Sequence, residues 1–487
     1  MNNKNLEELK LVYKAIERTY ITMNENIHDD IIKQHKYRKN EIMNDKSLNE
    51  KQKQEAINIL NGNYNFDKIR YNIGKKNVCK DCNNEYFAKT YCEHCIRIYL
   101  KENFSNWTSK NNKIDKLIQD CQIKSLAPNR IVEWIPFDRL KKVKYFKKGG
   151  FSEIYKAIWI DGYYDEWDAK EKRLKRAGTH KVILKALKNV ESANRSWYDE
   201  AVSHLTISNK WAEIVLCNGL TQNPENREYM IVMERMDADL RGYLKQNNKT
   251  LTWERRIKIA FDIIEALYFI HKENVIHRDL HSGNVLYFHG YDSWYISDLG
   301  FCGPADNPSN SVYGNLPYIA PEIIHGKTHT QASDIYGIGI IMWEISSGCP
   351  PFYNCKHDFF LAMKIVNGTR PTIVEGTPSE YKELMEQCWN RNPSERPVIN
   401  DLLDKIERMW KNCYNNIELN TLKVYPEPNY YSPENSRSYY SNSHSTSSFY
   451  NFKYFPNKDI MGEQEENHSK PYDFNIDTNR IINCEKT

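Results

Sequence analysis

The chain has 487 residues, with 68 Lys or Arg against 64 Asp or Glu, and its formal net charge is +4. A single hydrophobic core rarely grows beyond about 250–300 residues, so the length predicts more than one domain. So small a net charge produces only a weak overall field, which argues against nucleic acid as a partner.

Neither secretion nor membrane insertion is indicated. Residues 1–5 are not followed by the apolar stretch of a secretory signal. The longest strongly apolar run, residues 335–345, is far too short for a membrane helix, which needs about 20 apolar residues. The 12 cysteines, in a chain that is not secreted, indicate reduced thiols or metal ligands rather than disulfides. We expect an intracellular protein, cytoplasmic and with the nucleus as an alternative, and no membrane partner.

The first segment, residues 1–75, is predicted to be helical. Apolar residues recur there at three- and four-residue spacing, which is typical of an amphipathic helix: Leu9, Val12, Tyr13, Ile16 and Tyr20. Ser47 with Glu50 resembles a capping box that opens a second helix. A solvated helical arm is the expectation, and a docking role is the alternative.

Two Cys-x-x-Cys pairs follow, in residues 76–98. Cys79 with Cys82, and Cys92 with Cys95, supply four thiolates, which is the ligand set of a closed, structural Zn²⁺ site. The gap between the pairs is shorter than the usual ribbon spacing, and four unmetallated thiols are the alternative. A segment this short buries too little apolar area to fold unaided, so metal binding would supply its folding energy. We therefore predict a small zinc-ribbon-like segment, followed by a connecting segment over residues 99–135 that consists of a helix and an extended stretch.

A turn and a strand come next. Gly149 and Gly150 are typical of a loop whose backbone approaches an anion closely. A plain β-turn is the alternative interpretation of this glycine pair. Lys185 lies in the apolar run 182–187, which predicts a buried strand, and a buried Lys requires an anionic partner. Glu200, in a helical stretch, is our choice for that partner, with Asp199 as the alternative.

The most informative stretch is His-Arg-Asp at residues 277–279. Asn284 lies five residues after Asp279, and Asp298 begins an Asp-Leu-Gly motif 14 residues later. Three acceptor side chains at this spacing can hold one metal-bound triphosphate and one hydroxyl. Ala-Pro-Glu closes this region at residues 320–322. After residue 412 the composition becomes rich in Ser, Asn and Tyr with few aliphatics, which predicts a disordered tail over residues 412–487.

In this order, the motifs resemble the signature set of the protein-kinase superfamily. Cys388-Trp389 and Arg396-Pro397 make the chain most similar to the tyrosine-kinase-like group, including families expanded in some fungi. The resemblance implies an α+β, bilobal protein-kinase fold over residues 136–411, with a small β-rich lobe, a large helical lobe and the nucleotide between them. It also implies structural roles for Asp334 and for an ion pair between Glu322 and Arg396.

The resemblance assigns a role to each charged group. Asp279 would accept or orient the substrate proton, Asn284 and Asp298 would hold Mg²⁺, and Lys185, fixed by Glu200, would grip the phosphates of ATP. The implied nucleotide contacts are Gly149, Gly150, Phe151, Ser152, Ile154, Lys185, Met233, Glu234, Met236 and Leu286.

Several positions depart from the family pattern. Lys147 and Ser152 replace the first and third glycines, Ile183 replaces a small Ala beside the adenine, and Leu299 replaces a Phe. His281 stands where Ser/Thr enzymes carry Lys, and Asn315 where they carry Thr. Contact from His281 to the γ-phosphate would be less firm than contact from Lys.

The expected function is an ATP- and Mg²⁺-dependent protein kinase of intracellular signalling. It would phosphorylate Ser or Thr of protein substrates, with Tyr or dual activity as an alternative. Candidate regulatory phosphorylation sites are Ser309, Ser311 and Tyr313. The alternative function is a pseudokinase that serves as a nucleotide-binding or scaffolding protein, and the departures motivate it. Oligomeric state cannot be inferred from the sequence.

Overall fold

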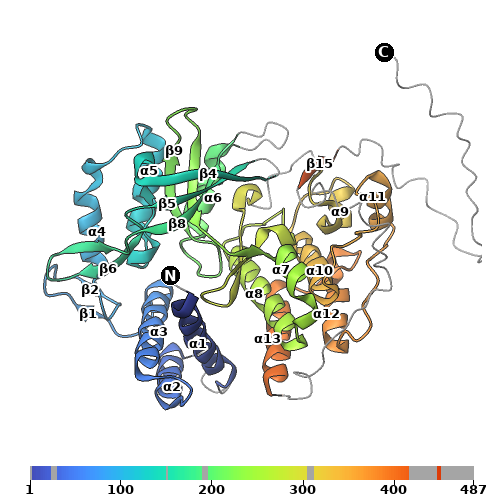
Figure 1. Ribbon diagram of the computed structural model, residues 1–487, viewed down its shortest axis with the longest axis horizontal. Helices are drawn as coiled ribbons and strands as arrows, with labels where there is room; N and C mark the ends of the chain where they lie inside the picture. The colour runs from blue at the N-terminus through green and yellow to red at the C-terminus, as the bar shows by residue number, and fades with distance from the viewer. Residues whose placement is uncertain are drawn as a thin grey trace, which may run out of the picture. The chain divides into compact units, whose positions relative to one another are not determined.

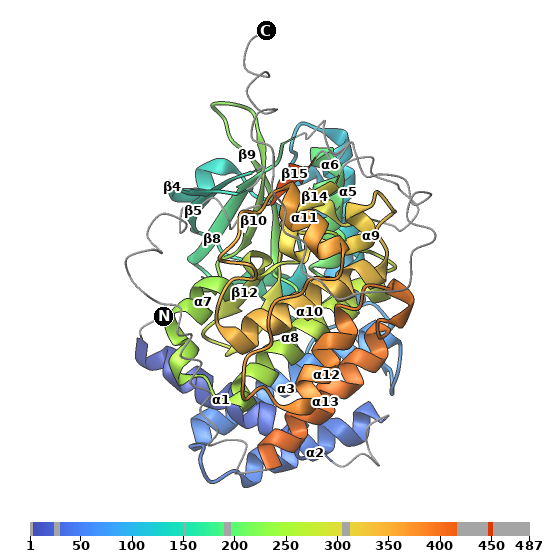
Figure 2. The ribbon, with the colours of Figure 1, turned by 90° about the vertical axis from the view of Figure 1, so that its right-hand side faces the viewer.

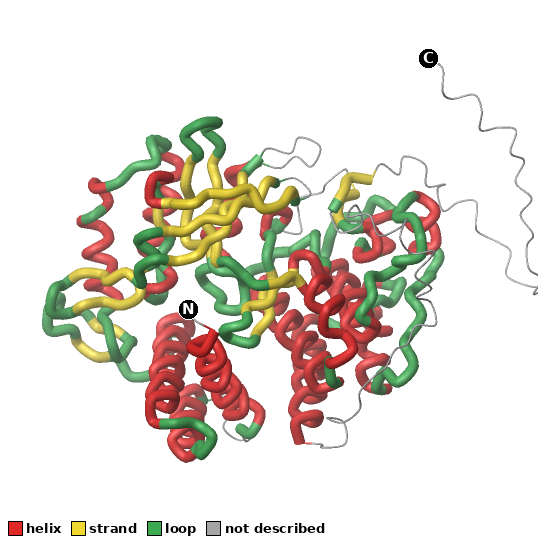
Figure 3. The backbone as a smooth tube through the Cα atoms, in the orientation of Figure 1, coloured by secondary structure: helices red, strands yellow, loops and turns green. Residues whose placement is uncertain are grey.

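The chain folds into a β-rich lobe and a helical lobe, with a helical bundle and a cysteine-rich segment before them (Figures 1 and 3). The computed structural model describes residues 3–23, 30–149, 152–188, 196–303, 312–415 and 447–450. The predicted α+β architecture with a β-rich and a helical lobe is confirmed. No helix in these described ranges is both long and apolar enough to cross a membrane.

The β-rich lobe is built on a six-stranded sheet in the order β3-β9-β10-β8-β5-β4. Its strands are β3 (Glu133–Trp134), β4 (Leu140–Lys148), β5 (Glu153–Trp159), β8 (His180–Ala186), β9 (Cys217–Gln222) and β10 (Tyr229–Glu234). The apolar run predicted to be a buried strand is β8, where Val182 and Leu184 are fully buried. Helix α6 (Trp197–Ile207) packs against this sheet through Ala201 and Leu205.

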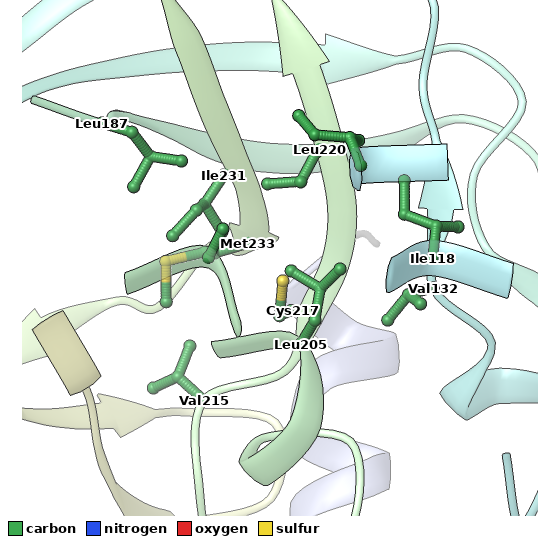
Figure 4. Close-up of a cluster of buried hydrophobic side chains, with 11 residues drawn as sticks. Ile118, Val132, Leu187, Leu205, Val215, Cys217, Leu220, Ile231 and Met233 are labelled. Carbon is green, nitrogen blue, oxygen red and sulfur yellow. The ribbon is translucent and has the colours of Figure 1, made fainter. Parts of the chain in front are cut away.

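The connecting segment contributes to the core of this lobe. Helix α5 (Asn112–Lys124) buries Ile114 and Ile118 completely, in the same cluster as Leu205 of α6 and Leu220 of β9. Figure 4 shows Ile118 beside Leu220 and Leu205. The helix expected in the connecting segment is present, and the segment, predicted to lead into the next domain, is a structural part of the β-rich lobe.

The helical lobe is organised around two buried helices, α8 (Trp253–Lys272) and α10 (Gln331–Ser347), and Figure 2 views it face on. The apolar run 335–345, expected to form a buried core helix, is buried throughout within α10. The other helices are α7 (Leu240–Asn247), α9 (Pro321–Ile324), α11 (Phe359–Val366), α12 (Ser379–Cys388) and α13 (Ile399–Asn415). A three-stranded sheet comprises β11 (Ala238–Asp239), β12 (Val285–Phe288) and β13 (Ser293–Ile296).

The N-terminal segment forms three helices, α1 (Asn3–Ile21), α2 (Ile31–Asn44) and α3 (Glu50–Tyr71). A core of apolar residues, including Val12, Ile42 and Leu60, holds them together. The helices also contact both lobes: Glu17 lies 3.4 Å from Lys258 of α8, and Arg70 donates to the Lys210 carbonyl at 2.6 Å. The predicted solvated arm is therefore wrong, because its apolar faces are buried in a docked bundle.

The start of α3 differs from the sequence prediction. The capping box consists of Asn49 and Gln52, whose side chains accept from each other's backbone N–H groups at 2.9 and 3.0 Å. Ser47, the predicted cap, instead donates its hydroxyl to Asp45 at 2.6 Å. The pairing of Ser47 with Glu50 is wrong because Asp45 engages the serine and the helix begins after Asn49.

The cysteine-rich segment contains the short hairpin β1 (Asn77–Val78) and β2 (Glu85–Tyr86), followed by α4 (Glu93–Glu102). An insertion between β5 and β8 forms a second hairpin, β6 (Tyr164–Asp168) and β7 (Arg173–Arg176). Ile96 and Leu100 of α4 are buried in one cluster with Leu174 of this hairpin. The cysteine-rich segment is thereby attached to the β-rich lobe.

One further strand pair joins segments that are far apart in sequence. Strand β14 (Val312–Gly314) pairs antiparallel with β15 (Ser448–Tyr450), which lies within the tail. Figure 2 shows β14 and β15 beside each other. This strand differs from the prediction of disorder over residues 412–487. Apart from residues 412–415 and 447–450, the tail lies outside the described residues.

Candidate active site

A cavity of about 380 Å³ collects the residues that the sequence analysis singled out. Its size is in the range of small-molecule sites, which is about 300–1,000 Å³. The predicted site residues that line it are Gly149, Ser152, Ile154, Lys185, Glu200, Met233, Glu234, Met236, Asp279, Asn284, Leu286 and Asp298. Gly150 and Phe151, also predicted to contact the nucleotide, lie outside the described residues.

One cation anchors the wall of this cavity. Lys185 Nζ on β8 lies 2.8 Å from Glu200 Oε1 on α6 and 2.5 Å from Asp298 Oδ1. Lys185 and Glu200 are only 4% and 2% exposed, so each needs the other to offset the loss of hydration. Asp199, the alternative partner, is exposed. The structure therefore joins strand, helix and Asp-Leu-Gly motif at one ammonium group.

The loop that carries Asp279 is held by hydrogen bonds from its own backbone. Buried Asp334 accepts from the N–H groups of His277 and Arg278 at 2.8 and 3.0 Å. Burial alone would raise the pKa of the Asp334 carboxyl, but hydrogen bonds from the His271 side chain and the His277 N–H hold this pKa below its usual value. An ionised Asp334 therefore holds the backbone at residues 277 and 278, and with it the start of the loop that carries Asp279.

Asn284 is oriented by the same loop. Its Nδ2 group donates to the Asp279 carbonyl at 2.9 Å, which leaves the amide oxygen as its potential ligand atom. Asp298 adopts a left-handed backbone conformation (φ 59°) immediately before the buried Leu299. Carboxylate and amide oxygens are the ligands that Mg²⁺ accepts in proteins, so Asn284 and Asp298 fit a magnesium site.

The departures from the family pattern leave the cavity open. Lys147 extends toward Asp239, with Nζ 3.9 Å from the carboxylate, and both residues line the cavity. Ile183 is half-buried on the cavity wall, opposite Met233 in the strand register. Neither side chain closes the space in which a nucleotide would bind.

His281 is buried and neutral. Burial, reinforced by the positive charge of Arg241, lowers its pKa to about 3. The Gly283 N–H donates to Nδ1 at 3.0 Å. Because Nδ1 accepts a hydrogen bond, the ring proton is on Nε2, and that nitrogen is a donor.

Two hydroxyl groups contact the Asp279 carboxylate. Ser447 Oγ lies 2.7 Å from Oδ1, and Tyr313 Oη lies 3.1 Å from Oδ2. The sequence identified Tyr313 only as a candidate phosphorylation site beside Ser309 and Ser311, which lie outside the described residues. Ser447 was missed entirely, because it lies in a stretch whose composition predicts only disorder.

A buried ion pair joins helix α9 to the loop that precedes α13. Arg396 makes two parallel contacts of 2.7 Å with the carboxylate of Glu322 and donates to the Ala332 carbonyl at 2.8 Å. Both side chains are almost fully buried. The pair expected from the resemblance is thus present and geometrically complete.

The four cysteines of the predicted metal site are also brought together. All four Sγ atoms lie within 4.8 Å of one another, with Cys79 and Cys95 3.5 Å apart and Cys82 and Cys92 3.7 Å apart. Tetrahedral Zn²⁺ with bonds of about 2.3 Å places its sulfur ligands about 3.8 Å apart. The donor set and its spacing therefore fit a structural zinc ion.

Comparison with known proteins agrees with this geometry. A family model described as "Protein tyrosine and serine/threonine kinase" matches residues 140–406. The probable serine/threonine-protein kinase roco7 of Dictyostelium discoideum is 27% identical over 313 residues, which cover 61% of this chain and 11% of that protein.

Two further relatives are named dual serine/threonine and tyrosine protein kinases. The one from Canis lupus familiaris is 36% identical over 174 residues, covering 35% of this chain and 18% of the relative. The one from Pimephales promelas is 32% identical over 234 residues, covering 46% of this chain and 25% of the relative. The match thus spans a quarter or less of the length of each of these three relatives.

Proposed function

Because the chain belongs to the protein tyrosine and serine/threonine kinase family, we propose that it transfers the γ-phosphate of ATP to hydroxyl groups of protein substrates. The observation that carries the proposal is the convergence of Lys185, Glu200, Asp298, Asn284 and Asp279 on one cavity. Phosphoryl transfer depends mainly on positioning and electrostatic stabilisation, and this set of side chains supplies both.

Each residue has a defined task in this mechanism. Lys185 holds phosphate oxygens, and its ion pair with Glu200 fixes the position of its ammonium group. Asn284 and Asp298 would hold Mg²⁺, which would supply positive charge to offset the charge of the phosphates. Asp279 orients the acceptor hydroxyl and takes its proton. His281, neutral and protonated on Nε2, would donate a hydrogen bond beside Asp279.

The proposed acceptor is Ser or Thr in a protein, with Tyr as a second acceptor. The relatives support this range, since they are named as serine/threonine or dual serine/threonine and tyrosine kinases. An intracellular location is part of the same proposal and is supported by the 12 cysteines. The pseudokinase alternative is less well supported, because the departures leave every charged group of the site in place.

Transfer of labelled phosphate tests the proposal. With Mg²⁺ and ATP labelled at the γ-position, the chain is expected to label casein, and Asp279→Asn is expected to lower the rate by roughly 10²–10⁴-fold because the general base is lost. Acid hydrolysis of the product identifies the labelled amino acid. Equal labelling by the chain and by Asp279→Asn would refute the enzymatic function.

We also propose that Cys79, Cys82, Cys92 and Cys95 bind one structural Zn²⁺. The proposal is supported by their mutual distances and by the shortness of β1 and β2, which have two residues each. All four positions of a tetrahedral site would be filled by sulfur, so no catalytic role is proposed there.

A further inference from the structure

A serine from the tail lies at the position of a substrate hydroxyl. Ser447 is 6% exposed and immediately precedes β15. Its Oγ lies 2.7 Å from Asp279 Oδ1 and 3.1 Å from His281 Nε2. A general base must lie about 2.6–3.2 Å from the oxygen whose proton it takes, and Asp279 lies within this distance of Ser447.

The directions of these hydrogen bonds are fixed by their partners. Since Nδ1 of His281 accepts from the Gly283 N–H at 3.0 Å, Nε2–H donates to Ser447 Oγ. The Ser447 O–H therefore donates to the Asp279 carboxylate, which can only accept when ionised. The Ser447 hydroxyl proton thus points toward the catalytic carboxylate, which accepts it as a hydrogen bond.

The backbone around Ser447 is bound as a peptide strand. Ser448 pairs with Gly314, Phe449 with Tyr313, and Tyr450 with Val312, in an antiparallel register. Addition of a strand to an exposed edge is a common mode of peptide recognition, in which main-chain hydrogen bonds supply affinity. Ser447 also lines the same cavity as Lys185 and Asp298, so its hydroxyl shares that space with a bound nucleotide.

We propose that the active site of this chain phosphorylates Ser447 of the same molecule, in cis. Residues 447–450 occupy the position at which an acceptor peptide would bind. This proposal rests on the kinase activity proposed above. In the reaction Ser447 Oγ forms a bond to the γ-phosphorus of ATP while the bond from that phosphorus to the bridging oxygen breaks. ADP leaves with the electron pair, and the Ser447 proton passes to Asp279.

Phosphorylation would also release the segment. A phosphoserine carries about −1.5 to −2 charges at neutral pH and, beside a carboxylate, is repelled. Phosphoserine at residue 447 would lie next to Asp279, in the cavity that Asp298 also lines, so the product would leave the site. Before phosphorylation, the segment occupies the acceptor position and competes with other protein substrates.

Tyr313 is the competing hydroxyl on Asp279. Its Oη lies 3.1 Å from Oδ2, farther than Ser447 Oγ lies from Oδ1. The Tyr313 ring is stacked on Phe301, with centroids 3.7 Å apart. Ser447 has both the shorter contact and the additional hydrogen bond from His281, which makes it the preferred acceptor.

The test uses the full chain, first treated with a phosphatase, then given labelled ATP, Mg²⁺ and casein. We expect phosphoserine at Ser447, formed at a rate that does not change on dilution. Self-labelling is expected to be lost in Ser447→Ala, whereas casein labelling by this variant is expected to begin at once.

Ser448→Ala is the matched control, which removes a neighbouring hydroxyl and is expected to retain label on Ser447. Tagged Asp279→Asn chain, added to the reaction, is expected to stay unlabelled.

Each contrary result has a distinct meaning. Labelled casein without label at Ser447, or label at Tyr313 in its place, overturns this proposal and leaves the kinase function intact. Label at Ser447 of the tagged Asp279→Asn chain overturns the assignment in cis. If only Ser447→Ala labels casein, the segment is an inhibitor and not an acceptor. If neither chain labels anything, this proposal and the kinase function both fail.

Discussion

Replacing Lys185 with Met is expected to lower phosphate transfer by roughly 10²–10³-fold, the typical effect of removing one charge-stabilising donor from an active site. The substitution also leaves Glu200, which is 2% exposed, without the cation 2.8 Å away. Breaking a buried ion pair from one side costs about 3–5 kcal/mol of folding free energy. Transfer of labelled phosphate and the midpoint of urea denaturation measure the two effects separately.

Two further variants separate loss of catalysis from loss of stability. Lys181→Met changes an exposed residue of the same strand and is expected to leave both measurements nearly unchanged. The double variant Lys185→Met with Glu200→Leu is expected to recover most of the stability without recovering transfer. The buried Glu200 charge is then gone, and Asp298, the other partner of Lys185, has a side chain that is 30% exposed and so remains partly hydrated. Recovery of transfer in the double variant would show that Lys185 has no role beyond stabilising the fold.

Removal of metal from the four-cysteine site is expected to unfold residues 76–98. Structural zinc contributes about 10–16 kcal/mol in small zinc-finger peptides, and the two short strands here offer little in its place. Metal analysis of the purified chain is expected to give one zinc per chain. A strong chelator, or Cys82→Ser, is expected to expose this segment to proteases and to weaken its packing against β6 and β7.

Cys355→Ser is the matched control for the zinc prediction, since it removes a thiol outside the four-cysteine cluster. It is expected to retain zinc and resistance to proteases. A zinc content near zero in chain purified with zinc present, or protease resistance that a chelator does not change, would contradict the assignment.

The kinase motifs could be predicted from the sequence because each depends on residue type at a short spacing. Three examples are the Lys in a buried strand, the Asp and Asn of one loop, and the paired cysteines. In each case, neighbouring residues in the sequence are enough to indicate the chemical role. Glu200 lies only 15 residues after Lys185, in a helical stretch, and Asp199 was the alternative partner. Glu322 and Arg396 lie 74 residues apart, and the family resemblance alone paired them. The observed contacts are 2.8 Å for the first pair and 2.7 Å for the second.

The remaining features depend on packing between segments for which no motif exists. The N-terminal helices are amphipathic, but the partner of an apolar stripe cannot be read from the stripe itself. Helix α5 joins the β-rich lobe because Ile114 and Ile118 fit beside α6 and β9, which periodicity alone does not reveal. Ser447 lies 168 residues from Asp279 along the chain, in a polar stretch with no pattern of its own.

The central claim is that side chains from distant parts of the chain converge on one magnesium nucleotide. A crystal structure of the chain with Mg²⁺ and a non-hydrolysable ATP analogue tests it most directly. We predict the metal at about 2.1 Å from oxygens of Asn284 and Asp298, with a phosphate oxygen on Lys185 and the γ-phosphate facing Asp279. A nucleotide absent from this cavity at saturating concentration, or bound there without Asp298 on its metal, would contradict the account.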